Sequence, residues 1–336
     1  MEFKNQGEEM KFLITGITGF AGPNLAKLLL KEGHEVHGVI RASNGREADL
    51  LDILTVEEHR AIVFHQLDLK HHYGVHKLLT SQEFDGVFHL AAQSHPPTSF
   101  RDPILTYEEN VSATMNLITS LEGSRTKFMF CSTSEVYGDS CKDNGILKTT
   151  DKLQPSNPYG ASKAAMDLYM QERMTNGFLN GFVTRAFSHT GPRRGYNFSI
   201  SSDAYQIAKM VLGLQEKKLQ IGNLQTQRIV IDVRDCVNAY YKLMMSPESN
   251  GKVFNVCGDT DNLYKMEHFT DLLVKTAGYE LHEVERVINP DFYRPIDIQV
   301  QIGDSSELRE MVGWKPTITI EKTMEDLLNY WIKKLS

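Results

Sequence analysis

The stretch TGITGFAG, residues 15–22, sets glycines three apart at Gly16, Gly19 and Gly22. An apolar run at 12–14 precedes it, and 23–30 has helical periodicity. A strand, a glycine turn and a helix in that order bring free backbone N–H groups and a positive dipole end to a pyrophosphate. Tight turns also use glycine for steric reasons alone, but this context favours a dinucleotide site. The predicted cofactor contacts are Gly16, Thr18, Gly19, Phe20, Ala21 and Gly22.

The first half of the chain alternates strand and helix patterns. Strand-like runs lie at 11–15, 35–40, 61–67, 85–90, 127–132 and 181–186. Helical patterns lie between them at 22–32, 72–81, 107–121 and 159–176. This alternation predicts an α/β fold: a Rossmann-type doubly wound parallel sheet, covered on both faces, with ligands at the carboxyl ends of its strands.

After Phe187 the pattern loosens into shorter segments. Helices are predicted at 202–216, 234–245, 265–276 and 320–334, and short strands at 219–222, 229–231, 253–256 and 298–302. We expect a smaller C-terminal α/β substrate lobe, with chain crossings between the two parts. Residues 10–187, with about 232–257, form the predicted cofactor-binding domain, and 188–231 with 258–336 form the predicted substrate lobe.

Composition restricts the classes of function. The 336 residues are 41% hydrophobic and 24% charged, as in ordinary globular enzymes. A net charge of −7 disfavours general binding to nucleic acids or anionic membranes. No apolar run is long enough for a membrane span, and residues 1–11 lack the apolar centre of a signal peptide. We therefore expect a cytoplasmic protein with reduced cysteines at Cys131, Cys141, Cys236 and Cys257.

The stretch KHHYGVH, residues 70–76, resembles a metal cluster at first sight. No acidic or cysteine partner completes the cluster nearby, and the stretch lies at a predicted helix start. We expect no metal site.

The end of the second predicted strand bears on the choice of cofactor. A NAD site usually has Asp or Glu there for the ribose 2′-hydroxyl, whereas this strand leads into Arg41 and Ser43, with no acid before Glu47. Arg41 and Ser43 suit a 2′-phosphate, although Arg41 is also interpretable as a solvent-facing loop residue. Asp68 is placed to meet the adenine amino group. We predict NADP, with NAD as the alternative; the remaining predicted contacts are Leu69, Leu90, Ala91 and Ala92.

Two further stretches carry the chemistry: STSEVYG at 132–138 ends a strand, and YGASK at 159–163 begins a helix. Tyr159 and Lys163 are four residues apart and so share a helix face. A free phenol has a pKa of about 10, and an adjacent ammonium and the positive charge of oxidised nicotinamide should both lower it. Tyr159 then takes a hydroxyl proton while hydride leaves the same carbon, and Thr133 holds the oxygen. Tyr-x-x-x-Lys alone is a common accident on helices; the glycine turn and the Ser/Thr strand end give it meaning here. Tyr159 and Lys163 also belong to the predicted cofactor contacts.

Four motifs together resemble the extended short-chain dehydrogenase/reductases: TGITGFAG, HLAAQS at 89–94, STSEVYG and NPYGASK at 157–163. The resemblance runs over nearly the whole chain. Within that group, the sequence is similar to the GDP-mannose 4,6-dehydratases and the GDP-4-keto-6-deoxymannose reductases. The resemblance implies a nucleotide-diphosphate-sugar substrate, a GDP-hexose or GDP-heptose.

The sequence combines features of both groups. EVHGVIRAS at 35–43, GPRRG at 191–195 and Thr133-Ser134-Glu135 resemble the dehydratases. DVRD at 232–235, FNVCGD at 254–259 and residues 294–316 look more like the reductases.

Thr133 favours a nucleotide-sugar 4,6-dehydratase, a lyase. In that scheme Tyr159 oxidises C4, Glu135 removes the C5 proton, and water leaves C6. In a reductase, Glu135 has only a binding or capping role. The alternatives are therefore a 4-reductase of a 4-keto-6-deoxy sugar, or another C4 dehydrogenase or epimerase of nucleotide sugars.

A diphosphate needs Arg or Lys at its oxygens, preferably in fork geometry. By resemblance, the predicted substrate contacts are Gln93, Ser94, Ser134, Ser188, His189, Arg194, Asn223, Arg228 and Arg294, although each arginine can equally be a surface residue. Ser188 and Ile229 stand where relatives usually have asparagine and aspartate. The redox chemistry is therefore better determined than the sugar or the base.

The helices at 107–121 and 159–176 match those that relatives pair across a subunit interface. Both have enough apolar residues to do so, and we expect a homodimer or homotetramer. A non-catalytic NADP-binding redox sensor is a different class of function. Retention of Thr133, Tyr159 and Lys163 together argues against a sensor, because sensing requires none of them.

Overall fold

A seven-stranded parallel sheet forms the centre of the computed structural model, which describes residues 8–41, 46–138, 140, 145–293 and 296–336. Across the sheet the order is β12 (Val253–Val256), β7 (Gly181–Ala186), β5 (Lys127–Thr133), β4 (Gly86–His89), β1 (Lys11–Thr15), β2 (Glu35–Ile40) and β3 (Val63–Gln66). The strand order reverses between β1 and β4, which is where a doubly wound sheet binds ligands. The predicted Rossmann-type sheet is therefore present.

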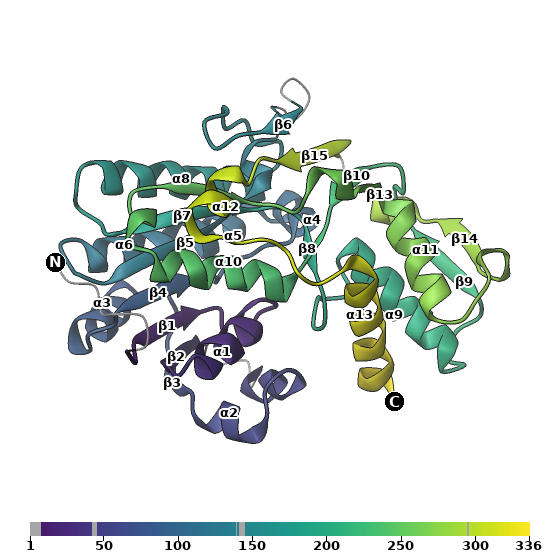
Figure 1. Ribbon diagram of the computed structural model, residues 1–336, viewed down its shortest axis with the longest axis horizontal. Coiled ribbons are helices and arrows are strands. Elements are labelled where there is room, and N and C mark those ends of the chain that lie inside the picture. Colours follow the sequence, from purple (N-terminus) through teal and green to yellow (C-terminus); the bar gives the residue numbers. More distant parts are fainter. Residues whose placement is uncertain (1–7, 42–45, 139, 141–144, 294–295) are drawn as a thin grey trace.

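Helices cover both faces of this sheet (Figure 1). On one face lie α1 (Gly22–Lys31) and α10 (Val233–Met245), whose Leu25 and Tyr240 share one buried core with Phe12. On the other face lie α3 (His72–Ser81), α6 (Ala113–Leu121) and α8 (Pro158–Thr175), whose Met170 packs with Leu117 and Phe128. Because both faces are buried, the strands read as continuous apolar runs.

Gly16 makes the turn after β1 possible. Its φ of +75° lies in the left-handed region, and a Cβ there would stand 2.7 Å from the backbone nitrogen of Ala91. A side chain at Gly22 would similarly collide with the carbonyl oxygen of Ile17. The predicted glycine turn is therefore present between β1 and α1, and it packs closely against the chain after β4.

The smaller lobe lies at the right of Figure 1. Its core is enclosed by α9 (Ser199–Val211), α11 (Met266–Thr276) and α13 (Ile320–Leu335), beside the parallel pair β9 (Lys218–Ile221) and β14 (Glu285–Ile288). A mixed sheet runs β13 (Leu263–Lys265), β10 (Gln227–Ile229), β15 (Val300–Gly303) and β6 (Ile146–Leu147), and β8 (His189–Thr190) pairs with β11 (Ile231–Asp232).

Two predicted helices have different bounds. α9 starts at Ser199, because Phe198 is extended, and it ends well before residue 216, at a turn where Gly213 has a φ of +70°. The predicted helix 107–121 is divided into α5 (Pro103–Tyr107), a π-helical turn at Glu108–Ser112, and α6. Short helices α2 (Val56–Arg60), α4 (Pro96–Arg101) and α12 (Ser306–Val312) complete the described chain. Among the described helices, none combines the length and apolarity that crossing a bilayer requires.

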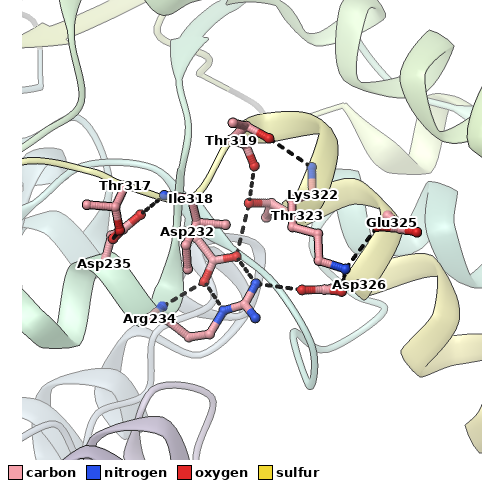
Figure 2. A network of polar contacts seen from close by, with 10 residues as sticks. All are labelled: Asp232, Arg234, Asp235, Thr317, Ile318, Thr319, Lys322, Thr323, Glu325 and Asp326. Atoms are coloured by element: carbon pink, nitrogen blue, oxygen red, sulfur yellow. Dashed lines mark hydrogen bonds and ion pairs between the residues drawn. The ribbon is translucent and has the colours of Figure 1, made fainter.

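A polar network fastens α13 to the start of α10 (Figure 2). The Asp232 carboxylate is fully buried and accepts hydrogen bonds from Arg234 Nε at 2.8 Å and from Thr323 Oγ1 at 3.0 Å. Arg234 also pairs with Asp326 of α13 at 2.7 Å. A buried carboxylate is costly without such partners, so the network holds the C-terminal helix of the smaller lobe against a helix of the main sheet.

Candidate active site

A cavity of about 1280 Å³ lies at the carboxyl ends of the parallel strands and extends into the smaller lobe. It exceeds the roughly 300–1,000 Å³ typical of one ligand, so it has room for a dinucleotide and a second molecule. The predicted residues on its wall are Gly16, Thr18, Gly19, Phe20, Ala21, Gly22, Arg41, Asp68, Leu69, Leu90, Ala91, Ala92, Ser94, Thr133, Ser134, Glu135, Tyr159, Lys163, Ser188, His189, Arg194, Asn223 and Arg228.

Gln93 is the predicted substrate residue that the fold keeps off this wall. Its side-chain Nε2 donates to Thr106 Oγ1 at 3.0 Å, and its side-chain Oε1 accepts from the His95 backbone N–H at 2.7 Å. Gln93 therefore holds the chain after β4 in shape and does not face the sugar. The predicted residues Ser43 and Arg294 lie outside the described residues.

The start of α8 positions the predicted catalytic pair. Asn157 caps the helix by accepting the Gly160 N–H at 2.8 Å, and Pro158 occupies the first turn. Tyr159 and Lys163 are both buried at the cavity wall. Lys163 Nζ lies 4.3 Å from the Phe130 ring centre and makes no hydrogen bond to another described residue. Its N–H donors therefore remain available to a ligand.

The acidity of Tyr159 corrects the sequence prediction. Burial raises the pKa of the phenol well above its ordinary value of 10.0, and the Thr133 hydrogen bond only partly opposes this. Burial likewise lowers the pKa of Lys163 to about 8. Desolvation thus outweighs the effect expected from the adjacent ammonium. In the protein alone, burial therefore favours the neutral form of the Tyr159 phenol.

Glu135 stands beside Thr133 on the same wall. Its Oε2 accepts a hydrogen bond from Asn157 Nδ2 at 2.8 Å, and its backbone N–H donates to Thr133 Oγ1 at 3.3 Å. Asn157 thus orients Glu135 and caps the helix that carries Tyr159. The stretch from Asn157 to Tyr159 thus fixes the Glu135 carboxyl relative to the phenol.

The loop after β8 closes over the glycine turn. His189 stacks on Phe20 with ring centres 5.7 Å apart, and the Arg194 guanidinium lies 4.8 Å from Phe20 and 3.5 Å from Phe198. Burial lowers the pKa of His189 to about 4, so the imidazole is neutral and donates its Nδ1–H to the Phe187 carbonyl at 2.8 Å. These contacts place Arg194 at the junction of the predicted cofactor and substrate regions.

Arg193 has a contact role that the sequence did not reveal. Its φ of +72° is unusual for a residue other than glycine. Its guanidinium donates to the carbonyl of Thr18 in the glycine turn at 3.0 Å and to the carbonyl of Asp49. Backbone conformation and long-range carbonyl contacts leave no signal in a single sequence, and the paired arginines gave no reason to separate Arg193 from Arg194.

The residues present fit a nicotinamide dinucleotide. A Cβ at Gly19 would stand 3.0 Å from the Gly16 carbonyl oxygen, so the turn favours glycine there, and Gly19 lines the cavity at the start of α1, where a pyrophosphate would meet free N–H groups. Asp68 lines the cavity, and its Oδ1 accepts a hydrogen bond from the Lys70 backbone N–H at 2.9 Å. Arg41 pairs with Glu109 at 2.9 Å, and its side chain is half exposed. A 2′-phosphate would therefore compete with Glu109 for Arg41.

The predicted diphosphate ligand Arg228 is held by its own lobe. It donates to the carbonyls of Ile298 at 2.7 Å and Gln227 at 2.8 Å, and lies 3.7 Å from Asp297. Asn223 approaches the same Asp297 at 3.5 Å. These partners fix Arg228 at the cavity wall, where it adds positive charge.

Metal ligation receives no geometric support in the described part of the chain. No group of three or more His, Cys, Asp or Glu side chains there is arranged to hold an ion. His72 and His76 stack on each other with ring centres 6.2 Å apart on an exposed part of α3.

A family model described as GDP-mannose 4,6 dehydratase matches residues 13–327. The chain belongs to the GDP-mannose 4,6-dehydratase family. GDP-6-deoxy-D-mannose reductase of Pseudomonas aeruginosa is 35% identical over 252 residues, which are 74% of this chain and 80% of the relative. GDP-mannose 4,6 dehydratase 1 of Arabidopsis thaliana is 29% identical over 331 residues, covering 94% of this chain and 88% of the relative.

Solved structures confirm the fold of this family member. The P. aeruginosa enzyme RMD, complexed with NADPH, has a TM-score of 0.80 at 28% identity, covering 97% of this chain and 99% of that chain. UDP-glucose 4-epimerase of Thermotoga maritima, with UDP-glucose, has a TM-score of 0.82 at 25% identity, covering 97% and 100%. The extended short-chain dehydrogenase/reductase resemblance and the Rossmann-type fold are thereby confirmed.

Proposed function

We propose that this family member is an NADP-dependent nucleotide-sugar 4,6-dehydratase that acts on a GDP-mannose-type sugar through a 4-keto intermediate. The observation that carries the proposal is the Glu135 carboxyl, oriented by Asn157 on the cavity wall that holds Tyr159 and Thr133. Reduction of a ketone needs one proton donor. Dehydration across C5 and C6 needs a second acid–base group, which Glu135 supplies.

Each residue has a separate task in this scheme. Tyr159 takes the C4 hydroxyl proton, and Thr133 hydrogen-bonds the same oxygen. A nicotinamide cofactor held by the glycine turn and Lys163 would supply reversible hydride transfer, first from C4 and then to C6. Glu135 removes the C5 proton, which the C4 ketone has made acidic, and gives it to the C6 hydroxyl, which departs as water. C5 is protonated again as the hydride reaches C6, by the proton that Tyr159 took from the C4 hydroxyl. Lys163, whose Nζ lies over the Phe130 ring and makes no hydrogen bond to another described residue, would bind the cofactor.

NADP is supported from two sides. RMD of P. aeruginosa, a structural neighbour at 28% identity, is complexed with NADPH, whereas a Thermus thermophilus epimerase at 22% identity is complexed with NAD. In this chain, the end of β2 provides Arg41 in place of the acid that would hold a free 2′-hydroxyl. We propose NADP as the cofactor and residues of the main sheet as its binding domain, with the smaller lobe holding the sugar nucleotide.

A 4-reductase of a GDP-4-keto-6-deoxy sugar is the second candidate. The 35% identity to GDP-6-deoxy-D-mannose reductase, against 29% for the A. thaliana dehydratase, favours it. In that reaction Tyr159 donates its proton to the 4-keto oxygen, and Glu135 does not exchange protons.

One experiment separates the two candidates. The purified protein is incubated with GDP-mannose and NADP without added reductant, and the products are analysed by mass spectrometry. The dehydratase proposal predicts loss of one water. Glu135→Gln should abolish that loss while bound NADP is still reduced in a single turnover. A protein that leaves GDP-mannose unchanged but consumes NADPH with the 4-keto sugar is a reductase, and the dehydratase proposal then fails.

We also propose a homodimer through the faces of α5, α6 and α8. Ile104, Met115 and Leu168 on these helices are exposed by 73%, 40% and 56%, more than apolar side chains usually are. Sedimentation of Leu168→Glu should show more monomer than the wild type does. The free thiols of Cys131, Cys236 and Cys257 fit a reducing compartment, and we propose the cytoplasm.

A further inference from the structure

The helix α9 presents a polar face to the cavity. Ser199, Ser202, Asp203 and Gln206 recur at the spacing of one helix face, and all four line the cavity. Gln206 is fully engaged with β9: its Nε2 donates to the Gln220 carbonyl at 3.0 Å, and its Oε1 accepts the Gln220 N–H at 2.8 Å. These two hydrogen bonds fix the orientation of α9 relative to β9, and with it the position of Asp203.

Asp203 is a buried carboxyl with little compensation from the protein. It is 5% exposed, and Thr270 Oγ1 donates to its Oδ2 at 2.7 Å. Arg286, the cation whose charge acts on Asp203, is itself paired with Asp271 and, at 3.5 Å, with Glu267. Among the described residues, no other hydrogen bond to the carboxyl is made. Buried carboxyls are normally paired with a cation or several donors, so Asp203 has acceptor capacity left for a ligand.

The position of Asp203 along the cavity identifies which part of a ligand it meets. Tyr159 and the strand ends of the main sheet form the reacting end. Asp203 lines the part of the cavity in the smaller lobe, together with Gly222, Asn223 and Met266. A sugar nucleotide with its hexose at Tyr159 therefore directs its base, the part of the molecule farthest from the hexose, towards α9. This step rests on the function proposed above.

We propose that Asp203 reads the base of the substrate by accepting hydrogen bonds from N1–H and the 2-amino group of guanine. A carboxylate has acceptors and no donor, so it needs donors on the base. Guanine presents two neighbouring donors on one edge. Uracil presents a single N3–H between two carbonyls, and the adenine amino group adjoins a ring acceptor. Asp203 is thus a specificity-determining residue for guanine.

The test measures the affinity of nucleoside diphosphates by calorimetry at pH 8. For the wild type, GDP should bind about ten-fold or more tightly than IDP, which lacks the 2-amino group, and more tightly than UDP. Asp203→Asn should lose about 10- to 100-fold in GDP affinity. The asparagine amide can donate to a 2-carbonyl, so the variant should gain affinity for xanthosine diphosphate. Asp271→Asn is the matched control: it lies next to Thr270 on α11 but outside the cavity wall, and should leave the GDP-to-IDP ratio unchanged.

The outcomes separate this proposal from the proposed function. Equal affinities of the wild type for GDP and IDP, measured without any substitution, would overturn the assignment of Asp203, even if GDP-mannose is converted. An unchanged GDP affinity in Asp203→Asn would do the same. If the wild type binds no nucleoside diphosphate and does not convert GDP-mannose, the proposed function fails and this inference fails with it.

Discussion

The buried Asp203 carboxyl gives a stability prediction whose sign is fixed by linkage. Burial raises the pKa of Asp203 from its ordinary 3.8 to about 7, and the Thr270 hydrogen bond and Arg286 oppose this less strongly. The folded protein therefore binds this proton more tightly than the unfolded chain. Stability from this group is present at low pH and is lost as pH rises from about 4 to about 7.

Asparagine at position 203 cannot titrate, and its carbonyl can still accept from Thr270. Between pH 5 and pH 7 the free energy of unfolding of the wild type falls by about 1.4 kcal/mol for each pH unit, or about 3 kcal/mol in all. Asp203→Asn does not lose this free energy. With an unfolding entropy of about 2.1 cal/mol/K per residue, a chain of 336 residues changes its Tm by about 4 °C for this free energy.

Thermal unfolding followed by circular dichroism at pH 5 and pH 8 measures this difference. The Tm of Asp203→Asn minus that of the wild type should increase by about 4 °C from pH 5 to pH 8. Asp271→Asn, whose carboxylate is paired with Arg286, should show no such increase. A difference between Asp203→Asn and wild type that stays constant, or shrinks, would refute the reasoning that burial disfavours the charged carboxyl.

Three further predictions address the site and its frame. Tyr159→Phe should lower kcat by about 10²- to 10⁴-fold while NADP affinity, measured by fluorescence quenching, stays within a few-fold of wild type; a normal rate would exclude the phenol from proton transfer. Arg41→Ala should weaken NADP binding by about ten-fold and leave NAD binding unchanged; equal losses for both cofactors would show that Arg41 does not contact the 2′-phosphate. Asp232→Ala leaves Arg234 without its buried partner and should reduce the free energy of unfolding by about 3 kcal/mol in a urea titration. An unaltered urea midpoint would show that the network in Figure 2 does not stabilise the junction.

Local patterns predicted the frame of the site well. The glycine turn, the strand ends and the Tyr159–Lys163 spacing each depend on residues within a few positions of one another. Backbone sterics and helix periodicity act over that range, so the turn after β1 and the start of α8 appear as expected. The same locality explains why Glu135, two residues after the end of β5, is found beside Thr133.

Long-range contacts decided where the sequence prediction went wrong. Gln93 is withdrawn from the cavity by Thr106, thirteen residues away, on a helix whose packing no local pattern reveals. The pKa of Tyr159 rises because the tertiary fold removes the phenol from water, and the hydrogen bond from Thr133 and the charge of Arg194 oppose this less strongly. Asp203 gave no signal at all, because an aspartate in a helix is ordinary until its burial is known.

In the proposed 4,6-dehydratase reaction, the hydride removed from C4 of the sugar is delivered to C6 of the same sugar. GDP-mannose carrying deuterium at C4 tests this directly, with a catalytic amount of NADP and analysis of the product by NMR. For the proposed dehydratase reaction, the expected product is a 4-keto-6-deoxy sugar with the deuterium at C6. Deuterium recovered in accumulated NADPH, or GDP-mannose recovered unchanged, would contradict it.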